Sequence, residues 1–312
     1  MISPKSLKKI HFTLYADDTS LIEPLCTFTS GLADKKEAAN SINKELNLIT
    51  DWLCLNKLSL NAKKPKMMIF HHRQKNISDI DLSLYINGTK IEQVKEFNFL
   101  GLVLDECMTW NSHIQKISGK IAVVNGALSR LKKILPSDIL KTIYNALVQP
   151  HLNFGVLLWG KNVKRIFKLQ KWAVRAICSS KYNAHTDPLF IKLKLLKIHD
   201  IYKLGILKFY YKHQKGLLPG YFSSMFDHTY PTHDYATRFR DQPQTARCNT
   251  MSAKNSIRYA LPEIVSNTPP SIVSKIFTHS PFGFANYAKS YFINQYNPIC
   301  VVDNCYICNP SL

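Results

Sequence analysis

Short alternations of apolar and polar residues near the beginning of the sequence predict β-strands. The segment 10–22, IHFTLYADDTSLI, alternates on both sides of Asp17 and Asp18, which predicts a β-hairpin with the two aspartates at its tip. In the segment 34–55 the apolar residues are spaced three and four apart, and acidic residues occupy the first turn. That spacing predicts an amphipathic helix.

More strands are predicted after this helix. The apolar run 67–70 and the alternating run 82–86 have strand character, and Asn87-Gly88 is a strong signal for a two-residue hairpin turn. The run 97–104, FNFLGLVL, predicts one further strand. The first third of the chain therefore indicates a small β-sheet with a helix packed on it.

From residue 111 onwards the apolar spacing becomes helical. The first helical stripe stops at Pro136, and Ser137 and Asp138 are expected to cap the next helix, which should end before Pro150. The same spacing predicts further helices at 162–179, 188–197 and 199–215.

The segment 162–179 is the most informative of these helices. Its apolar positions, from Val163 to Ile177, lie on one side, and a row of cations lies about half a turn away. This arrangement is typical of a helix that packs on a core and faces a phosphate backbone. The cations are Lys161, Lys164, Lys168, Lys171 and Arg175.

The segment 202–213 interleaves tyrosine and phenylalanine with lysine. Such a pattern can stack nucleic-acid bases, but a helix with a buried aromatic face and a basic outer face is the simpler explanation, and we favour that interpretation.

Beyond Gly216 the long helical patterns stop, and Pro, Ser, Thr, Asn and Tyr become frequent. We expect a loosely organised tail with short helices at 254–261 and 284–296. The chain is therefore predicted to be α+β. Its three regions are a strand-rich part over 1–108, a mostly helical part over 109–216 and an irregular tail over 217–312.

Charge is concentrated in the middle region. The chain has a net charge of +20, and residues 111–220 hold 20 Lys and Arg but only 3 Asp and Glu, so this stretch contributes 20 − 3 = +17. A localised excess favours a polyanionic partner, with nucleic acid first and an acidic membrane second. A solvated basic face without a partner is the remaining alternative.

Composition limits the class of protein. Hydrophobic residues make up 46% of the chain and aromatic residues 11%, which indicates a folded protein, and neither a membrane span nor a secretory signal is recognisable. The cysteines do not form a secreted disulfide pattern, so we expect an intracellular protein of the nucleus, the cytoplasm or both. Cys300, Cys305 and Cys308 could form part of a zinc site, but free thiols are expected because no fourth ligand lies nearby.

The feature with the clearest chemical implication is Tyr15-Ala16-Asp17-Asp18. Adjacent carboxylates repel each other unless a cation is present, and oxygen ligands of this kind suit Mg²⁺. Two such ions can activate a hydroxyl for attack on a phosphate and stabilise the leaving group. On residue chemistry alone, an acidic surface turn is the simpler interpretation of two adjacent aspartates.

Longer segments change that balance because they resemble the reverse transcriptases of non-LTR (LINE-type) retrotransposons. HFTLYADDTSLI resembles the family's catalytic hairpin, and DWLCLNKLSLNAKKPKMMIF and FNFLGLVLDECMTWNSHI resemble the segments that follow it. YNALVQPHLNFGVLLWG, LQKWAVRAICSSKYNAHTDPLF, HDYATRFR and NSIRYALPEI continue the resemblance in the same order. The resemblance implies a partial palm over 1–108, a thumb-like domain over 109–216 and a tail over 217–312.

The resemblance also implies roles for single residues. Asp17 and Asp18 would hold the catalytic Mg²⁺ or Mn²⁺, with Tyr15 and Ala16 close to the primer end or the incoming nucleotide. Lys64 matches a lysine implicated in proton donation to pyrophosphate, although the residue after it is proline where the family has threonine. Phe99, Leu100 and Gly101 would form the turn that holds the primer, and the cations of 161–175 would contact the nucleic-acid backbone.

Family members carry another metal-binding aspartate, and the fingers, upstream of the catalytic hairpin, whereas no acidic residue precedes Asp17 here. We therefore expect a truncated reverse transcriptase that does not polymerise DNA alone, with an RNA template and a DNA primer as partners, no membrane and no stable protein partner. A non-enzymatic nucleic-acid-binding remnant that uses the basic thumb is the alternative, and a pseudogene product without function is a third.

Overall fold

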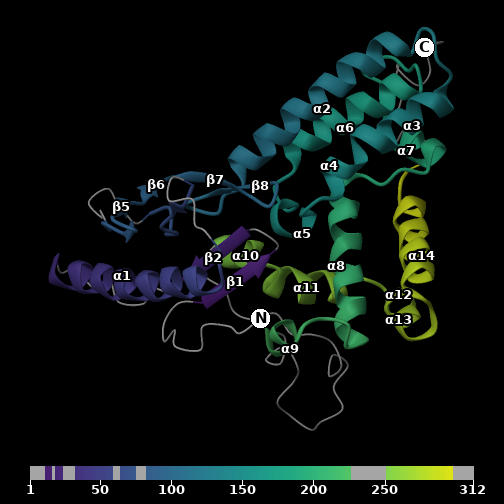
Figure 1. The fold of residues 1–312 in the computed structure, drawn as a ribbon. Coiled ribbons are helices and arrows are strands. Elements are labelled where there is room, and N and C mark those ends of the chain that lie inside the picture. The colour runs from purple at the N-terminus through teal and green to yellow at the C-terminus, as the bar shows by residue number, and fades with distance from the viewer. Residues whose placement is uncertain are drawn as a thin grey trace, which may run out of the picture. The chain divides into compact units, whose positions relative to one another are not determined.

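The computed structural model describes residues 11–15, 18–23, 32–58, 64–74, 82–225 and 251–297. The chain divides into two compact units, which we call the N-terminal unit, Met1–Met108, and the helical unit, Thr109–Leu312 (Figure 1). The small sheets lie in the first and most of the helices in the second, so the chain is of mixed α and β structure, as the sequence predicts.

The N-terminal unit begins with a β-hairpin. Strands β1 (His11–Tyr15) and β2 (Asp18–Ile22) pair antiparallel, from His11 opposite Ile22 to Tyr15 opposite Asp18. Helix α1 (Leu32–Leu55) follows. The predicted hairpin and the predicted helix at 34–55 are thus confirmed at the level of the backbone.

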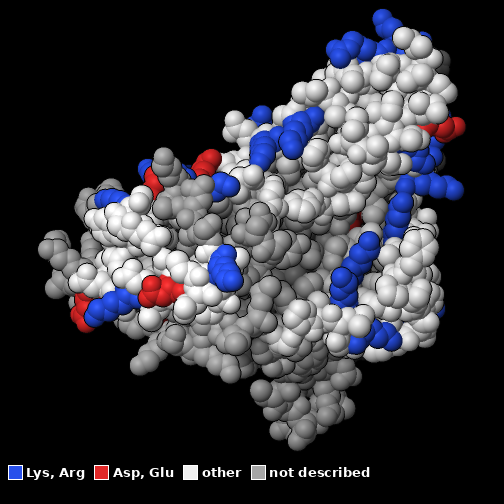
Figure 2. All heavy atoms as spheres, viewed as in Figure 1, with Lys and Arg blue, Asp and Glu red and all other residues white. Residues whose placement is uncertain are grey.

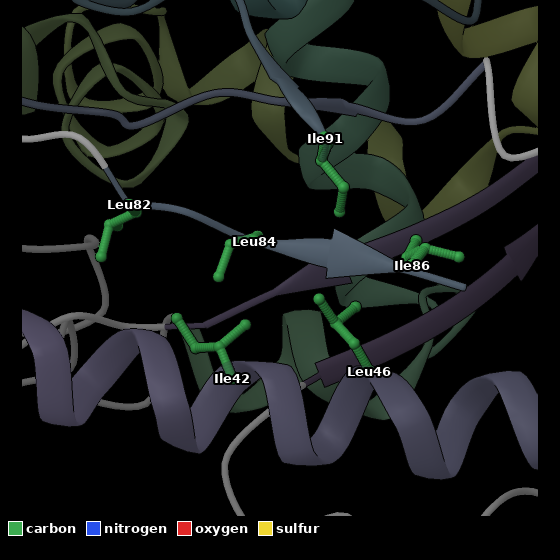
Figure 3. Packing of buried hydrophobic residues seen from close by; sticks show 6 residues of the cluster. All are labelled: Ile42, Leu46, Leu82, Leu84, Ile86 and Ile91. Atoms are coloured by element: carbon green, nitrogen blue, oxygen red, sulfur yellow. The ribbon is translucent and has the colours of Figure 1, made fainter. Parts of the chain in front are cut away.

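The core of this unit lies between α1 and an extended segment. Ile42 and Leu46 point from α1 toward the segment that carries Leu84 and Ile86 (Figure 3). Asn43 fastens the two together, because its Nδ2 donates to the Ser83 carbonyl (3.1 Å) and its Oδ1 accepts from the Tyr85 N–H (2.9 Å). The buried aliphatic cluster consists of Ile42, Leu46, Leu82, Leu84, Ile86 and Ile91.

The remaining strands of this unit are short. Asn87 (φ 50°) and Gly88 (φ 73°) form the predicted turn between β4 (Tyr85–Ile86) and β5 (Thr89–Lys90), since left-handed backbone at both positions is what a type I′ turn requires. The apolar run at 67–70 contributes to β3 (Lys66–Met67), which pairs parallel with β6 (Glu92–Gln93).

The prediction of one strand over 97–104 was wrong. The chain turns there, and β7 (Glu96–Phe99) pairs antiparallel with β8 (Leu102–Asp105). The physical reason is the backbone of Leu100 (φ 46°) and Gly101 (φ 85°), which is left-handed at both residues and reverses the chain.

The helical unit follows the sequence pattern closely over residues 111–214. The predicted helices appear as α2 (Asn111–Leu131), α3 (Ser137–Leu147), α6 (Lys164–Ile177), α7 (Asp187–Leu193) and α8 (Ile198–Gln214), with the short α4 (Gln149–Asn153) and α5 (Val156–Trp159) between α3 and α6. The N-cap of α3 is Pro136, without a side-chain capping bond, so the predicted capping by Ser137 and Asp138 was wrong. Helix α2 packs along α6, and α8 contacts α4, α5 and α6.

Buried Gln170 joins the elements of this unit. Its Nε2 donates to the Tyr144 hydroxyl (3.0 Å) and to the Leu196 carbonyl (2.9 Å), and its Oε1 accepts from the Ile198 N–H (2.9 Å). One amide side chain on α6 thereby ties α3 to the beginning of α8. Because the side chain is fully buried and three of its bonds are satisfied, it stabilises one arrangement of these helices.

The last described part of the chain, 251–297, is more ordered than the expected irregular tail. It forms α10 (Met251–Asn255), α11 (Ile257–Ser266), α12 (Pro270–Val273), α13 (Lys275–Thr278) and α14 (Pro281–Asn294), while α9 (Gly220–Met225) precedes it. Helices α11 and α14 pack against α8. Phe284, Ala288 and Phe292 are buried, so these helices complete the core of the helical unit.

Hydrogen bonds of Tyr296 also attach the end of the described chain to the beginning of α8. The Tyr296 hydroxyl donates to Asp200 Oδ2 (2.7 Å) and accepts from the Lys197 N–H (3.0 Å). Burial, reinforced by the neighbouring Asp200 carboxylate, raises the pKa of Tyr296 well above its usual value. The hydroxyl therefore stays protonated and keeps donating to the carboxylate.

Candidate nucleic-acid interface

At the tip of the β1–β2 hairpin, which is predicted to be catalytic, the structure describes the pairing of the backbone only. The pairing of Tyr15 with Asp18 brings the two strands together on either side of Ala16 and Asp17. Ala16 and Asp17 lie outside the described residues, as do the side chains of Tyr15 and Asp18. The roles of these four residues remain predictions.

Lys64 lies in the N-terminal unit just before β3, and its side chain is exposed. The neighbouring Lys66 forms an ion pair with Glu92 across the β3–β6 pair. Lys64 has no ion pair with a described acidic residue, which leaves its ammonium group accessible. Its role as a proton donor stays a prediction.

The turn at Phe99, Leu100 and Gly101 has a defined geometry. Phe99 pairs with Leu102, and the two residues between them form the tip of the β7–β8 hairpin. The Leu100 side chain is 41% exposed although its backbone is left-handed, a conformation that a leucine adopts at an energetic cost. The hairpin thus presents a strained, exposed apolar tip, and contact with a primer stays a prediction.

Metal ligands do not gather elsewhere in the described parts of the chain. No group of three or more His, Cys, Asp or Glu side chains suited to a metal ion occurs there. Cys107 lies 3.8 Å from His71 Nε2, but burial, with Glu106 and Asp105 nearby, raises the pKa of its thiol. Cys300, Cys305 and Cys308, the alternative zinc ligands, lie outside the described residues.

Helix α6 has the predicted two-sided character. Val163, Ile166, Ala173 and Ile177 are buried, so the apolar stripe packs into the core. The cations of the opposite stripe do not behave alike, however.

Two of these cations are used within the protein. Lys161 Nζ donates to the Lys254 carbonyl (2.7 Å), lies 3.6 Å from Glu263 Oε2 and approaches the ring of Tyr259. Arg175 Nε donates to the Ala184 carbonyl (2.8 Å), and burial lowers the pKa of its guanidinium. Lys161 and Arg175 therefore tie segments of the protein together, and their contact with a nucleic-acid backbone stays a prediction.

The first turns of α6 carry the accessible cations. Lys164 and Lys168 are exposed, and Lys171 Nζ lies 4.5 Å from the centre of the Phe167 ring. Arg165 is exposed in the same turn, and Trp172, 44% exposed, follows one turn after Lys168. Arg165 and Trp172 were missed in the sequence, although each lies four residues or fewer from Lys168 and so shares its side of the helix.

We call Lys164, Arg165, Lys168 and Trp172 the α6 face. Among the described residues its cations have no acidic partner, and two of the three acids of 111–220, Asp187 and Asp200, are engaged elsewhere. Asp187 binds Lys197 (2.7 Å), and Asp200 binds Tyr296 and Lys203. The positive charge of the α6 face is therefore left for an external anion.

The helical unit shows no sign of a bilayer-spanning element, since no helix in the described ranges combines the necessary length and apolar character. Figure 2 shows Lys and Arg side chains distributed over the visible surface of the molecule and far fewer Asp and Glu side chains. A surface with this excess of cations suits a polyanionic partner.

Known proteins similar to this chain are polymerases of mobile elements. The RNA-directed DNA polymerase from mobile element jockey of Drosophila funebris is 24% identical over 194 residues, which are 60% of this chain and 20% of the relative. The probable RNA-directed DNA polymerases from transposons X-element and BS of Drosophila melanogaster are each 24% identical, over 53% and 62% of this chain and 18% and 21% of their own lengths. The aligned part of this chain thus spans about a fifth of each relative.

No protein-family model matches the chain, and no solved structure matches it. The predicted resemblance to the reverse transcriptases of non-LTR retrotransposons is nevertheless confirmed by these relatives.

Proposed function

We propose that this relative of non-LTR reverse transcriptases acts as part of a reverse transcriptase, with a catalytic hairpin and a helical unit that binds the backbone of a primer–template. The observation that carries the proposal is the α6 face, whose cations have no acidic partner among the described residues although the packing side of the same helix is buried. A helix anchored on one side and charged on the other holds cations at fixed spacing, which suits a regular row of phosphates.

The salt dependence of binding tests this proposal. Affinity for an RNA–DNA hybrid, measured by fluorescence anisotropy, should fall steeply between about 50 and 200 mM salt because each phosphate contact releases a counterion. The triple change Lys164→Glu, Arg165→Glu and Lys168→Glu should weaken binding and reduce the slope of log affinity against log salt by about 2 to 3.

A matched control separates the α6 face from net charge. Lys133, Lys181 and Lys192 are exposed and lie outside α6. Their triple change to Glu alters the net charge by the same amount and should leave most of the affinity intact. Equal losses in the two variants, or binding that does not respond to salt, would contradict the proposal.

The catalytic part of the proposal rests on Tyr15-Ala16-Asp17-Asp18. When Mg²⁺ or Mn²⁺ is bound there, the metal supplies charge stabilisation for nucleotidyl transfer, and Asp17 and Asp18 would be its carboxylate ligands. The antiparallel pairing that ends at Tyr15 and Asp18 supports this, because it holds the two ends of the tetrapeptide at one hairpin tip.

We propose that these 312 residues alone do not extend a primer, because residues 1–16 contain no further carboxylate for the metals. A primer-extension assay with Mg²⁺ or Mn²⁺ should give no product above background. Product that is lost on Asp17→Asn would overturn this and show a complete site.

The alternative function is nucleic-acid binding without catalysis. The charge excess of the helical unit favours it independently of the hairpin. In that case the double change Asp17→Asn and Asp18→Asn should leave hybrid affinity unchanged both with and without Mg²⁺, whereas a working metal site should make affinity depend on Mg²⁺ through these residues.

A further inference from the structure

A hollow in the helical unit brings together lysines, side-chain amides and apolar side chains, a combination that the α6 face does not have. It has a volume of about 550 Å³ and lies where α3, α4 and α5 meet α8 and α14. This volume is within the range of small-molecule sites in proteins, roughly 300–1,000 Å³. Its lining includes Asn145, Gln149, Asn153, Phe209, Lys208, Lys212 and Lys289.

Lysines from different helices converge on this hollow. Lys208 and Lys212 are exposed on successive turns of α8, and Lys289 is half-buried on α14. Burial and the nearby charges of Lys141 and Lys208 lower the pKa of Lys289. None of these lysines forms a salt bridge with a described acidic residue, so the positive charge here is not compensated by that part of the chain.

The packing of the helices does not require this cluster of like charges. The core side of α8 is occupied by Ile206, Leu207, Tyr210 and Tyr211, which are buried. The lysines face a different side, where mutual repulsion raises the free energy of the folded state unless an anion is present.

The rest of the lining is apolar or carries amides. Leu157, Leu196 and Leu204 contribute aliphatic surface, and half-buried Phe209 contributes an aromatic ring. Gln149 Nε2 donates to Asn153 Oδ1 (3.1 Å), which shows that two of the amides are side by side. Amides offer both donors and acceptors, which match the edges of nucleobases but add nothing for a bare phosphate ion.

We infer that this hollow binds one unpaired nucleotide of a single-stranded RNA or DNA segment. The base lies against Phe209 and the leucines, its edge meets the amides, and the adjoining phosphates lie between Lys208, Lys212 and Lys289. A base in a duplex is stacked and paired and could not enter, so the site selects a single strand. The inference rests on the proposed nucleic-acid binding and adds a second, strand-selective site to the α6 face.

Two variants test the site by different means. The triple change Lys208→Gln, Lys212→Gln and Lys289→Gln removes the charge, and Asn145→Trp fills the hollow from an exposed position on α3 without changing any charge. Each should reduce affinity for a labelled single-stranded oligonucleotide by about tenfold and leave affinity for a hybrid duplex within about twofold. Thermal unfolding of both variants checks that the helical unit remains folded.

The α6 variant Lys164→Gln, Arg165→Gln and Lys168→Gln is the matched control, and it should weaken duplex binding more than single-strand binding. If the hollow variants and the α6 variant weaken both ligands equally, the lysines act only as general surface charge and the inference is overturned. Unchanged single-strand affinity in Asn145→Trp overturns the placement of the base.

Competition identifies the source of the phosphate and separates this inference from the proposed function. A mononucleotide or inorganic phosphate that displaces the oligonucleotide at micromolar concentration would show a site for a free anion and overturn the strand site. If the unaltered chain binds neither a single strand nor a duplex, the proposed function fails. If it binds both but the hollow variants behave like the unaltered chain, the inference alone fails.

Discussion

The two units of this chain differ in what holds them together and in what they leave exposed. Residues 1–110 carry 14 Lys and Arg against 13 Asp and Glu, and the N-terminal unit is built on a small aliphatic cluster around α1. The helical unit has a large excess of cations, and buried polar ties at Gln170 and Tyr296 join segments that are distant in the sequence. Under the proposed function, the predicted catalytic hairpin belongs to the N-terminal unit and the predicted backbone-binding face to the helical unit.

The largest effect is expected for Gln170→Leu in the helical unit. The change leaves the Tyr144 hydroxyl, the Leu196 carbonyl and the Ile198 N–H without their partner, which should cost about 4 kcal/mol of unfolding free energy. Hydrogen exchange of peptides from 109–225 would measure this loss of unfolding free energy. Gln295→Leu, at an exposed position, is the control, and a loss below about 1 kcal/mol for Gln170→Leu would mean that the ties contribute little.

A smaller loss, confined to the other unit, is expected for Leu46→Ala. Leu46 is 5% exposed in the aliphatic cluster, and its truncation should cost about 3 kcal/mol. Leu48 lies on the same helix but is 46% exposed, so Leu48→Ala should cost far less. Faster exchange in the helical unit after Leu46→Ala would contradict the independence of the two cores.

Alkaline pH should lower the stability of the helical unit. Burial raises the pKa values of Tyr144 and Tyr296 above their usual value and that of Tyr202 to about 12. Above about pH 10 the unfolded chain loses protons that the folded chain retains, so the helical unit should lose about 1.4 kcal/mol per pH unit for each of these tyrosines. Urea unfolding between about pH 9 and 11 would measure this slope, which Tyr144→Phe should reduce.

The smallest effect is expected at the β7–β8 hairpin. Leu100→Asn should stabilise the N-terminal unit by about 0.5–1 kcal/mol, because asparagine tolerates a left-handed backbone better than leucine. If the leucine tip contacts a primer, the same change should weaken primer–template binding. A rise in stability without any loss of affinity would remove the case for a functional role of Leu100.

Periodicity was sufficient to predict most of the helices but not how their surfaces are used. The apolar stripe of α6 was found because a core-facing helix repeats its apolar residues. Lys161 and Arg175 belong to the same row as Lys164 and Lys168, and only the structure shows that the first two are used internally by distant residues. Spacing along one helix contains no information about which other segment covers its ends.

Other features of the fold could not be predicted from periodicity either. The run 97–104 is almost entirely apolar, so the strand pattern alone did not mark the turn at Leu100 and Gly101, which only the family resemblance indicated. In the last described segment the short helices expected at 254–261 and 284–296 overlap α11 and α14, whereas α12 and α13 were not predicted. Pro270, at the first position of α12, is easily taken for a loop signal. The hollow gathers residues from several helices and could not be found in any single segment.

The bond between Tyr296 and Asp200 has a consequence for anyone who maps this protein by deletion. A fragment that ends after α8 would retain the whole α6 face but would lose the hydroxyl that satisfies the Asp200 carboxylate, together with Phe284 and Phe292 from the core. Loss of duplex binding in such a fragment would report unfolding and not the location of the α6 face, and the fragment would also lack Lys289 of the hollow. Fragments meant to isolate binding should therefore begin near Thr109 and extend beyond Tyr296.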